Sequence, residues 1–328
     1  MKVLVYGAGV IGSYLAHVLC AAGNDVTVLA RGRRKRDLEE KGLVIRHYLQ
    51  RTGTVDRPHI TGALDAGVRY DAVFAVMQFQ QMHAVLPELA AADTPLVCLV
   101  GNNIAAPEME RAILDGSAAP KTVLFGFQGT GGRREDGKAV CVRMGAGSLT
   151  CGTLRGEPDE AVKAVFQKLF AGQAYRVDYV PDMDAWYKCH LAFILPIAYL
   201  CYQTDCDLRR STRRQRRQMM DAVAEGYRLL RSLGYPILPE GDDRYFEPGL
   251  RRAAMCVMLW FMAKTAVGRL AASDHCRHAV SELEALDRAF MALRERSPRL
   301  PMPNWDTLRA GMPAWETLHR TWDAETVL

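Results

Sequence analysis

The sequence predicts an α/β fold, a doubly wound sheet in the N-terminal part followed by an all-α C-terminal domain. Three observations predict it. In the first half, apolar runs alternate with amphipathic segments, and a glycine motif directly follows the first run; in the second half, long helical patterns replace the strand signals. With 328 residues, 49% of them hydrophobic, the chain is long enough for two cores. We therefore predict two domains, residues 1–180 and 181–328.

Short apolar runs in the first half predict strands buried on both faces of a parallel sheet. These runs are Val3–Tyr6, Val26–Leu29, Ala72–Met77, Leu96–Val100 and Val123–Phe125. Glycine-rich turns then flank Ala139–Arg143 and Ser148–Thr153, which we expect to be hairpin strands that extend the same sheet. A helix over Asp159–Ala171 and a strand near Tyr175–Tyr179 complete the first domain.

Four helical patterns predict the second domain. They are Asp182–Cys206, Arg213–Leu233, Leu250–Leu270 and Ser281–Arg294. Within the third, the apolar stretch Ala253–Leu270 raises the question of a membrane span, but it contains Lys264 and Arg269 and is short for a bilayer. We interpret it as a buried core helix or as the contact of a homodimer, and expect no membrane partner.

Composition excludes several classes of protein. Nine cysteines without a C-x-x-C pattern indicate reduced thiols rather than a disulfide framework or a metal site. The start at Met1 runs straight into a strand and a glycine motif, so we expect no cleavable signal and a cytoplasmic protein. The net charge of +5 is mild, and the basic run Arg209–Arg217 has no interleaved aromatic residues. We interpret that run as a solvated helix start and expect no nucleic-acid partner.

The glycine motif Gly7-Ala8-Gly9-Val10-Ile11-Gly12 lies between the first strand and a helix, which is typical of a Rossmann-type dinucleotide site. Gly7 allows the tight turn, Gly9 lets a pyrophosphate approach the backbone, and Gly12 allows close packing of helix and strand. The pyrophosphate is expected at the positive end of the helix, where Val10 and Ile11 begin it. A glycine-rich turn without a ligand is the alternative.

The second strand leads to Arg31, Arg33 and Arg34 instead of the acidic residue that binds the ribose of NAD. A planar guanidinium suits a phosphate, so Arg31, helped by Arg33 or Arg34, is predicted to bind the 2′-phosphate of NADP. The alternative is a solvated basic turn.

On these motifs, and on those that follow, the chain resembles the ketopantoate reductase (2-dehydropantoate 2-reductase) family over nearly its whole length. The resemblance implies NADPH binding by the glycine motif and Arg31. It also implies a helical domain of the 6-phosphogluconate dehydrogenase C-terminal type, and a role in pantothenate biosynthesis.

The resemblance also assigns the site residues. Leu99–Ile104 looks like the family's Asn-Gly segment, so Asn102 is expected to contact the nicotinamide ribose and the substrate. Lys188, which follows Trp186, matches the catalytic lysine. Glu282, eight residues after Asp274, matches the glutamate that binds a substrate hydroxyl.

Three positions depart from the family. A lysine is replaced by Gln78, which we keep as a cofactor-binding position, and a substrate-binding asparagine is replaced by Ala192. The stretch Ala266–Leu270 has no hydroxyl where the family keeps a serine. These departures support the fold, the cofactor and the reaction more strongly than ketopantoate as the substrate.

Reducing a ketone places negative charge on the carbonyl oxygen, so the site needs a proton donor there. We predict that Lys188 fills this role, that Glu282 holds a substrate hydroxyl or positions Lys188, and that a 2-oxo acid or related carbonyl lies in the cleft between domains. Solvated helix residues are the alternative reading of both side chains. Two other functions stay open: an NADP-binding sensor without turnover, and a hydroxy-acid or opine-type dehydrogenase.

Overall fold

The computed structural model describes residues 1–65 and 67–322, with Val267 described by its backbone alone. The chain forms two compact units, Met1–Asp184 and Ala185–Leu328. The boundary between them falls in the first turn of α6 (Met183–Gln203), and the sequence prediction placed it at 180/181.

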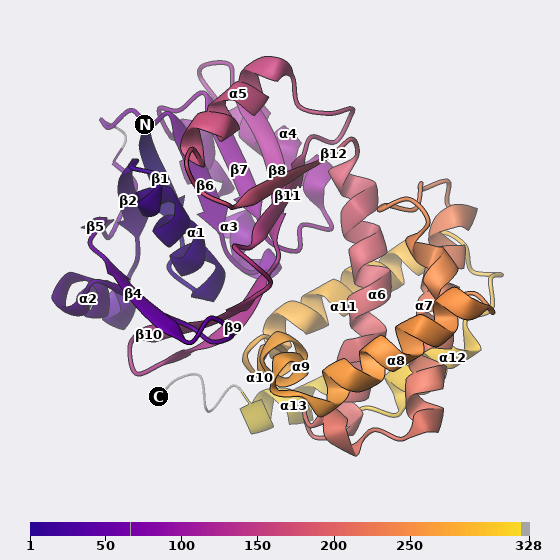
Figure 1. Ribbon diagram of the computed structural model, residues 1–328. Helices are drawn as coiled ribbons and strands as arrows, with labels where there is room; N and C mark the ends of the chain where they lie inside the picture. Colours follow the sequence, from indigo (N-terminus) through magenta and orange to yellow (C-terminus); the bar gives the residue numbers. More distant parts are fainter. Residues whose placement is uncertain (66, 323–328) are drawn as a thin grey trace. The chain divides into compact units, whose positions relative to one another are not determined.

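The first unit is built on an eight-stranded sheet (Figure 1) with the order β12-β11-β8-β7-β6-β1-β2-β5. Its strands are β1 (Lys2–Tyr6), β2 (Asp25–Leu29), β5 (His59–Thr61), β6 (Ala72–Val76), β7 (Leu96–Val100), β8 (Thr122–Gln128), β11 (Ser148–Gly152) and β12 (Arg176–Val180). All neighbours are parallel except β8 and β11. The predicted doubly wound α/β fold is confirmed.

Helices cover both faces of this sheet. On one face, α1 (Val10–Ala21) and α5 (Glu160–Leu169) share a core with Val3 and Val5 of β1. On the other face, α3 (Phe79–Ala91) and α4 (Ala106–Gly116) pack side by side. Because side chains alternate along a strand, Tyr6 at the end of β1 points to the α3 face.

A second, four-stranded sheet packs against α1, in the order β4-β3-β10-β9. Its strands are β3 (Leu43–His47), β4 (Thr52–Asp56), β9 (Thr130–Glu135) and β10 (Lys138–Arg143). The expectation that Ala139–Arg143 extends the main sheet was therefore wrong, whereas Ser148–Thr153 does extend it as β11. Ala139 and Cys141 of β10 are buried in one core with α1 and with Leu43 and Ile45 of β3, so burial of these apolar side chains stabilises β10 in the second sheet.

The second unit is helical, as predicted. Besides α6 it contains α7 (Arg213–Ser232), α8 (Leu250–Lys264), α9 (Ala266–Gly268), α10 (Asp274–His278), α11 (Val280–Glu295), α12 (Pro303–Ala310) and α13 (Trp315–Trp322). Trp305 of α12 stacks on Phe290 of α11, with ring centroids 4.7 Å apart. Gly226 lets α7 approach α6 closely, because a Cβ at this position would lie 2.9 Å from the Cβ of Ala192. Ala192 is therefore a core position.

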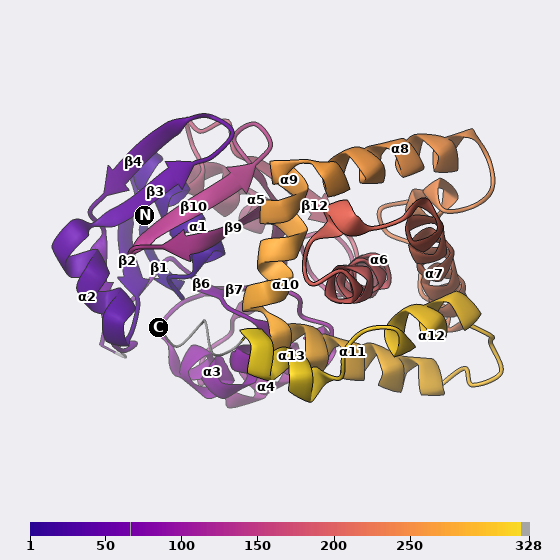
Figure 2. The ribbon, with the colours of Figure 1, turned by 90° about the horizontal axis from the view of Figure 1, so that it is seen from below.

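The helix predicted over Leu250–Leu270 ends at Lys264, because Thr265 has an extended backbone with φ −111° and ψ 163°. The chain then folds back so tightly that a Cβ on Gly268 would lie 1.9 Å from the carbonyl oxygen of Met262. The interpretation of a buried core helix was also wrong: only Ala263 of α8 is buried. Figure 2 shows α8 along an edge of the second unit.

No single helix in the described part of the chain is long and apolar enough to cross a membrane. One bent pair, Leu250–Lys264 with Arg269–His278, passes that test by length and composition only. All nine cysteines are free thiols.

Candidate functional site

Two glycines of the loop between β1 and α1 are required by the fold itself. Gly7 has φ +117°, and a Cβ there would lie 2.1 Å from the carbonyl oxygen of Val76. A Cβ on Gly12 would lie 1.9 Å from the carbonyl oxygen of Gly7. Both distances are below any van der Waals contact, so neither position accepts a side chain while β1, β6 and α1 keep their places.

Gly9 is different, because no contact within the described residues requires a glycine there. Its φ of −68° suits any residue, and a Cβ built on it meets no atom within 4 Å. It is the N-cap residue of α1, which has no side-chain cap and no acidic residue in its first turn. Val10 and Ile11 are partly buried against the core, so their backbone N–H groups are held in place. The loop thus leaves an open, electropositive cradle that fits the pyrophosphate of a dinucleotide.

The side chain of Arg34 supports the glycine loop through hydrogen bonds to Ala8 and Ser13. Its side chain is buried, with Nε donating to the carbonyl oxygen of Ala8 at 3.0 Å and a terminal nitrogen donating to Ser13 Oγ at 3.0 Å. Its other terminal nitrogen donates to the carbonyl oxygen of Gly137 at 2.6 Å. Three of the five N–H donors of Arg34 are thus used within the protein, and the side chain is buried, so Arg33 is the more accessible of the two arginines expected to help Arg31. Arg33 is exposed.

Arg31 follows β2 as the N-cap residue of α2 (Gly32–Lys41). Its terminal nitrogen donates to the hydroxyl of Tyr6 at 2.7 Å and lies 3.5 Å from a carboxylate oxygen of Glu88 on α3. The Tyr6 hydroxyl in turn donates to the other Glu88 oxygen at 2.8 Å. Burial, followed by the contact with Glu88, raises the pKa of Tyr6 to about 12. Arg31 therefore lies where the prediction requires, but with an acidic neighbour.

Sequence reasoning missed Tyr6 and Glu88. The strand β2 ends without a carboxylate, as the sequence shows, yet the fold brings one from a helix 57 residues further along the chain. No local pattern marks Glu88, which reads as an ordinary helix carboxylate.

The ends of β6 and β7 meet at Gly101, where φ is +158° and a Cβ would lie 2.6 Å from the carbonyl oxygen of Met77. Gln78 is the N-cap residue of α3, and its side-chain oxygen accepts a hydrogen bond from Gln80 at 2.8 Å. Asn102 is buried, and it does not cap α4, whose N-cap is Ala105. Gln78 and Asn102 stay predicted cofactor-binding residues.

In the second unit, Lys188 is buried on α6, with 5% of its surface exposed. Its Nζ lies 4.8 Å from the ring centroid of Tyr235, a distance typical of a cation–π contact. Glu282 on α11 is also buried, at 3% exposed, with Oε2 3.9 Å from His275 Nε2. Neither side chain is the solvated helix residue of the alternative reading. Burial of this kind is common at reaction sites, although it assigns no role by itself.

His190 lies on α6, two positions after Lys188. Its ring stacks on Trp186, with centroids 5.0 Å apart and planes 11° apart. Burial first, and then the nearby His275, lowers the pKa of His190 to about 3, so its ring is neutral near pH 7. His275 thus lies close to both His190 and Glu282. The position of His275 between Asp274 and Glu282 in the sequence was the signal that could have marked it as a candidate site residue.

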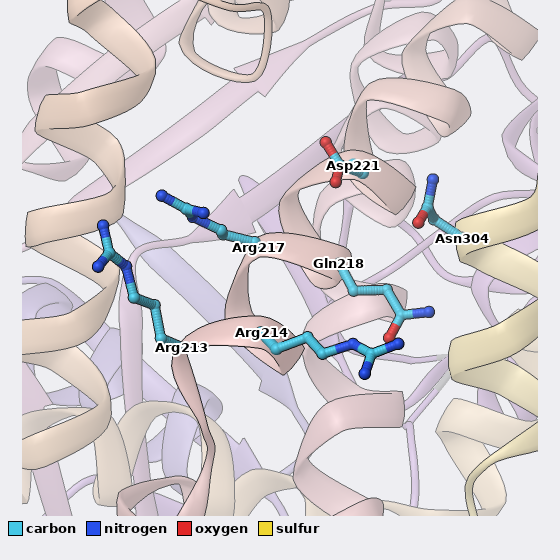
Figure 3. Close-up of a pocket in the computed structure, with 6 residues that line it drawn as sticks. All are labelled: Arg213, Arg214, Arg217, Gln218, Asp221 and Asn304. Atoms are coloured by element: carbon cyan, nitrogen blue, oxygen red, sulfur yellow. The ribbon is translucent and has the colours of Figure 1, made fainter.

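A cavity of about 530 Å³ lies in the second unit, outside the predicted site. It is lined by Arg213, Arg214, Arg217, Gln218, Asp221 and Asn304 (Figure 3). The first five come from α7, where the basic run begins a helix that Thr212 and Gln215 cap reciprocally. The run is an exposed helix start, in line with its interpretation.

Comparison with known proteins agrees with this arrangement. Residues 3–156 match the family model described as Ketopantoate reductase PanE/ApbA, the same family that the sequence motifs resemble. A Bacillus subtilis (strain 168) relative, the uncharacterized oxidoreductase YkpB, is 33% identical over 89 residues. This match spans 27% of the chain and only 28% of the relative's length.

Solved structures share the fold over the full chain. A PanE/ApbA family ketopantoate reductase from Ralstonia eutropha JMP134 has a TM-score of 0.73 at 17% identity, covering 98% of this chain and 100% of that one. D-mandelate dehydrogenase in a ternary structure with NADH and anilino(oxo)acetate has a TM-score of 0.74 at 16% identity, covering 99% of both chains. At such identities the likeness shows the architecture alone.

Proposed function

We propose that this chain, whose residues 3–156 belong to the ketopantoate reductase PanE/ApbA family of oxidoreductases, uses NADPH to reduce a 2-oxo acid or related carbonyl to the hydroxy acid. The observation that carries the proposal is Gly9. It is the one glycine of the motif that the fold does not require, and it leaves open space at the uncapped start of α1. A bound pyrophosphate explains why no side chain stands there.

The first unit provides the cofactor contacts. The glycine loop and the first turn of α1 bind the pyrophosphate through backbone N–H groups, and Arg31 pairs with the 2′-phosphate. In this proposal Gln78 and Asn102, which follow the carboxyl ends of β6 and β7, contact the nicotinamide half of the cofactor. The cofactor supplies the hydride for the carbonyl carbon.

The second unit provides the proton. Lys188 donates a proton to the carbonyl oxygen as negative charge develops on it, and its ammonium stabilises that charge. Because Lys188 is buried, this interaction is screened less than one in water. Glu282, also buried, accepts a hydrogen bond from a polar group of the substrate, and His275 lies beside it to orient its carboxylate.

The substrate differs from ketopantoate in this proposal. Ala192 packs against Gly226 in the core of the second unit, so it offers no amide, and no hydroxyl stands in Ala266–Leu270. D-mandelate dehydrogenase, of the same architecture, was solved with anilino(oxo)acetate, an aromatic 2-oxo acid derivative. Aromatic and branched 2-oxo acids are therefore the first compounds to test beside ketopantoate.

The test is NADPH oxidation by the purified chain against a panel of 2-oxo acids. Lys188→Ala is expected to lower kcat by at least about 100-fold, typical for a general acid, while NADPH binding stays unchanged. Lys168→Ala, which removes an exposed lysine of α5, is the matched control and should change neither quantity. Equal activity of Lys188→Ala and wild type would overturn the catalytic role. Tight NADPH binding without turnover of any substrate would favour the sensor.

We propose further that the apolar face of α8 binds a second copy of the chain. Leu250, Val257, Met258, Trp260 and Phe261 are 48 to 91% exposed. Side chains of this size expose together on the order of 600 Å², close to the roughly 800 Å² that each partner buries in a standard interface. Monomeric proteins rarely leave a patch of that size uncovered.

A further inference from the structure

The contacts of Arg31 bear on a question that the family match leaves open, namely which nicotinamide cofactor the site prefers. NADPH differs from NADH by the 2′-phosphate on the adenosine ribose. A doubly wound fold places this ribose beyond the carboxyl end of the second strand, where Arg31 begins α2. A cation there favours the phosphate, and a carboxylate there favours the ribose hydroxyls of NADH.

This chain has both groups at that position. Arg31 comes from the end of β2, and Glu88 comes from α3, across the end of β1. Tyr6, the last residue of β1, connects them, because its hydroxyl accepts a hydrogen bond from Arg31 at 2.7 Å and donates one to Glu88 at 2.8 Å. The Arg31 guanidinium also lies 5.6 Å from the Tyr6 ring centroid, and its Nε points to the carbonyl oxygen of Gly62 at 3.4 Å.

The Tyr6 hydroxyl can donate to Glu88 near neutral pH, as in the 2.8 Å hydrogen bond between them. A tyrosine hydroxyl is protonated at pH 7 in any case, and the raised pKa of Tyr6 extends that state to more alkaline pH. Tyr6 is 4% exposed and its ring is held by packing, whereas the side chains of Arg31 and Glu88 are 60% and 43% exposed. Solvent and ligand therefore reach the two charged groups, while the tyrosine between them stays in place.

A 2′-phosphate that pairs with Arg31 enters within a few ångströms of the Glu88 carboxylate. Either the guanidinium turns away from Tyr6 and Glu88, losing a 2.7 Å hydrogen bond and an ion pair, or the phosphate stays beside a like charge. Both routes weaken NADPH binding. NADH meets no such penalty, because ribose hydroxyls donate to a carboxylate.

We propose that Glu88, held by Tyr6, is a specificity-determining residue that competes with the 2′-phosphate for Arg31 and so narrows the preference for NADPH over NADH. This inference rests on the proposed nicotinamide-dependent function. The carboxylate that favours NADH then comes from α3, and the residue after β2 remains an arginine that favours NADPH. One site therefore accepts both cofactors.

The test is to measure the Kd of NADPH and NADH by fluorescence titration of the full chain and of Glu88→Gln. The variant keeps the size of the side chain and removes its charge. We expect the Kd of NADPH to fall about fivefold, the upper range for an exposed charge pair. The Kd of NADH should change by less than about twofold, because the glutamine oxygen still accepts a hydrogen bond from a ribose hydroxyl. Glu108→Gln, which removes an exposed carboxylate from α4 of the same unit, is the matched control and should leave both values unchanged.

Two further measurements separate competition from a merely structural role. In an Arg31→Gln background, Glu88→Gln should no longer tighten NADPH, because the group for which it competes is gone. The fragment 2′,5′-ADP should follow NADPH in all variants, and 5′-AMP should follow NADH. Weaker or unchanged NADPH binding in Glu88→Gln would overturn the inference alone. Failure of the wild type to bind either cofactor would overturn the proposed function with it.

Discussion

Replacing the glycines of the β1–α1 loop one at a time separates what the fold needs from what the ligand needs. In Gly9→Ala the new methyl group meets no protein atom within 4 Å, and the φ of −68° suits alanine. Alanine is a poorer N-cap residue than glycine but restricts the unfolded chain, and these effects nearly cancel. We expect the free energy of unfolding to change by less than about 1 kcal/mol.

Gly12→Ala is the contrasting variant. Its Cβ would lie 1.9 Å from the carbonyl oxygen of Gly7 and 3.4 Å from the Val76 side chain, so α1 must move away from β1 and β6. Overpacking of this kind typically costs about 1–3 kcal/mol, and a backbone atom as the obstacle places this case at or above the upper end. The loss is measured as a shift of the urea midpoint.

Gly9→Ala should affect NADPH affinity much more than it affects stability. The Gly9→Ala methyl occupies the space that we assign to the pyrophosphate, so we expect NADPH affinity to fall about 100-fold in a chain of normal stability. Gly23→Ala, at another open glycine of the first unit, controls for a general effect of lost stability on binding, because its φ of +79° strains alanine by about 1 kcal/mol or more. Unchanged NADPH affinity in Gly9→Ala would refute the cofactor site itself, since the open space at Gly9 is the observation that carries it.

Two other predictions test separate parts of the molecule. Burial first, and then Arg143, lowers the pKa of His47 to about 4 in the folded chain. Its ordinary value near 6.5 applies when the chain unfolds, so protonation favours unfolding. The contribution of His47 to stability is complete above about pH 6.5 and falls towards pH 4, by about 2 kcal/mol at pH 5. His190, whose pKa is lowered as well, adds a separate loss in the same pH range. Urea titrations at pH 7.5 and 5 should show this loss, and His47→Gln should reduce it. Equal losses in the wild type and the variant would contradict the assignment of this pH dependence to His47. For α8, Phe261→Lys is expected to convert a dimer to a monomer in light scattering with unchanged circular dichroism, and a monomeric wild type would exclude the interface.

The parallel core of the first unit could be predicted because its strands are buried on both faces. Burial on both faces leaves uninterrupted apolar runs such as Leu96–Val100, which a sequence shows directly. The strands β3 and β4 left no such run. In β4 the burial pattern has no fully buried residue, so its polar, exposed sequence reads as a loop until β3 is known to pair with it.

The length of α8 was overestimated for a related reason. Apolar residues continue through Thr265 to Leu270, and hydrophobicity alone does not reveal that the backbone turns at Thr265. Nor does it tell a core helix from one that offers its apolar face to another molecule. Both arrangements use the same residue types, and only the exposed fractions of Trp260 and Phe261 distinguish them.

For the candidate site, the sequence showed which residue types are present but not which groups their side chains contact. Arg31 and Arg34 are three positions apart in one basic run, yet Arg34 donates to Ala8, Ser13 and Gly137 inside the protein while Arg31 reaches Tyr6 at the surface. Helix geometry explains the difference, because Arg31 precedes the first turn of α2 and Arg34 lies within it. The sequence alone does not reveal which guanidinium N–H groups bond within the protein and which stay available to a ligand.

The same reasoning limits what the residue after β2 reveals about the cofactor. A carboxylate favours NADH, and an arginine favours NADPH, only while each acts alone. At the end of β2 the potential that a 2′-phosphate meets is the sum over all nearby charges, and a carboxylate 3.5 Å from Arg31 offsets much of the attraction of the guanidinium. Tyr6 holds Glu88 beside Arg31 through a hydrogen bond, and the Tyr6 hydroxyl does not lose its proton near pH 7. We therefore expect β1, α2 and α3 together to set the cofactor preference, so that a change on α3 alters the preference while the glycine motif and Arg31 stay unchanged.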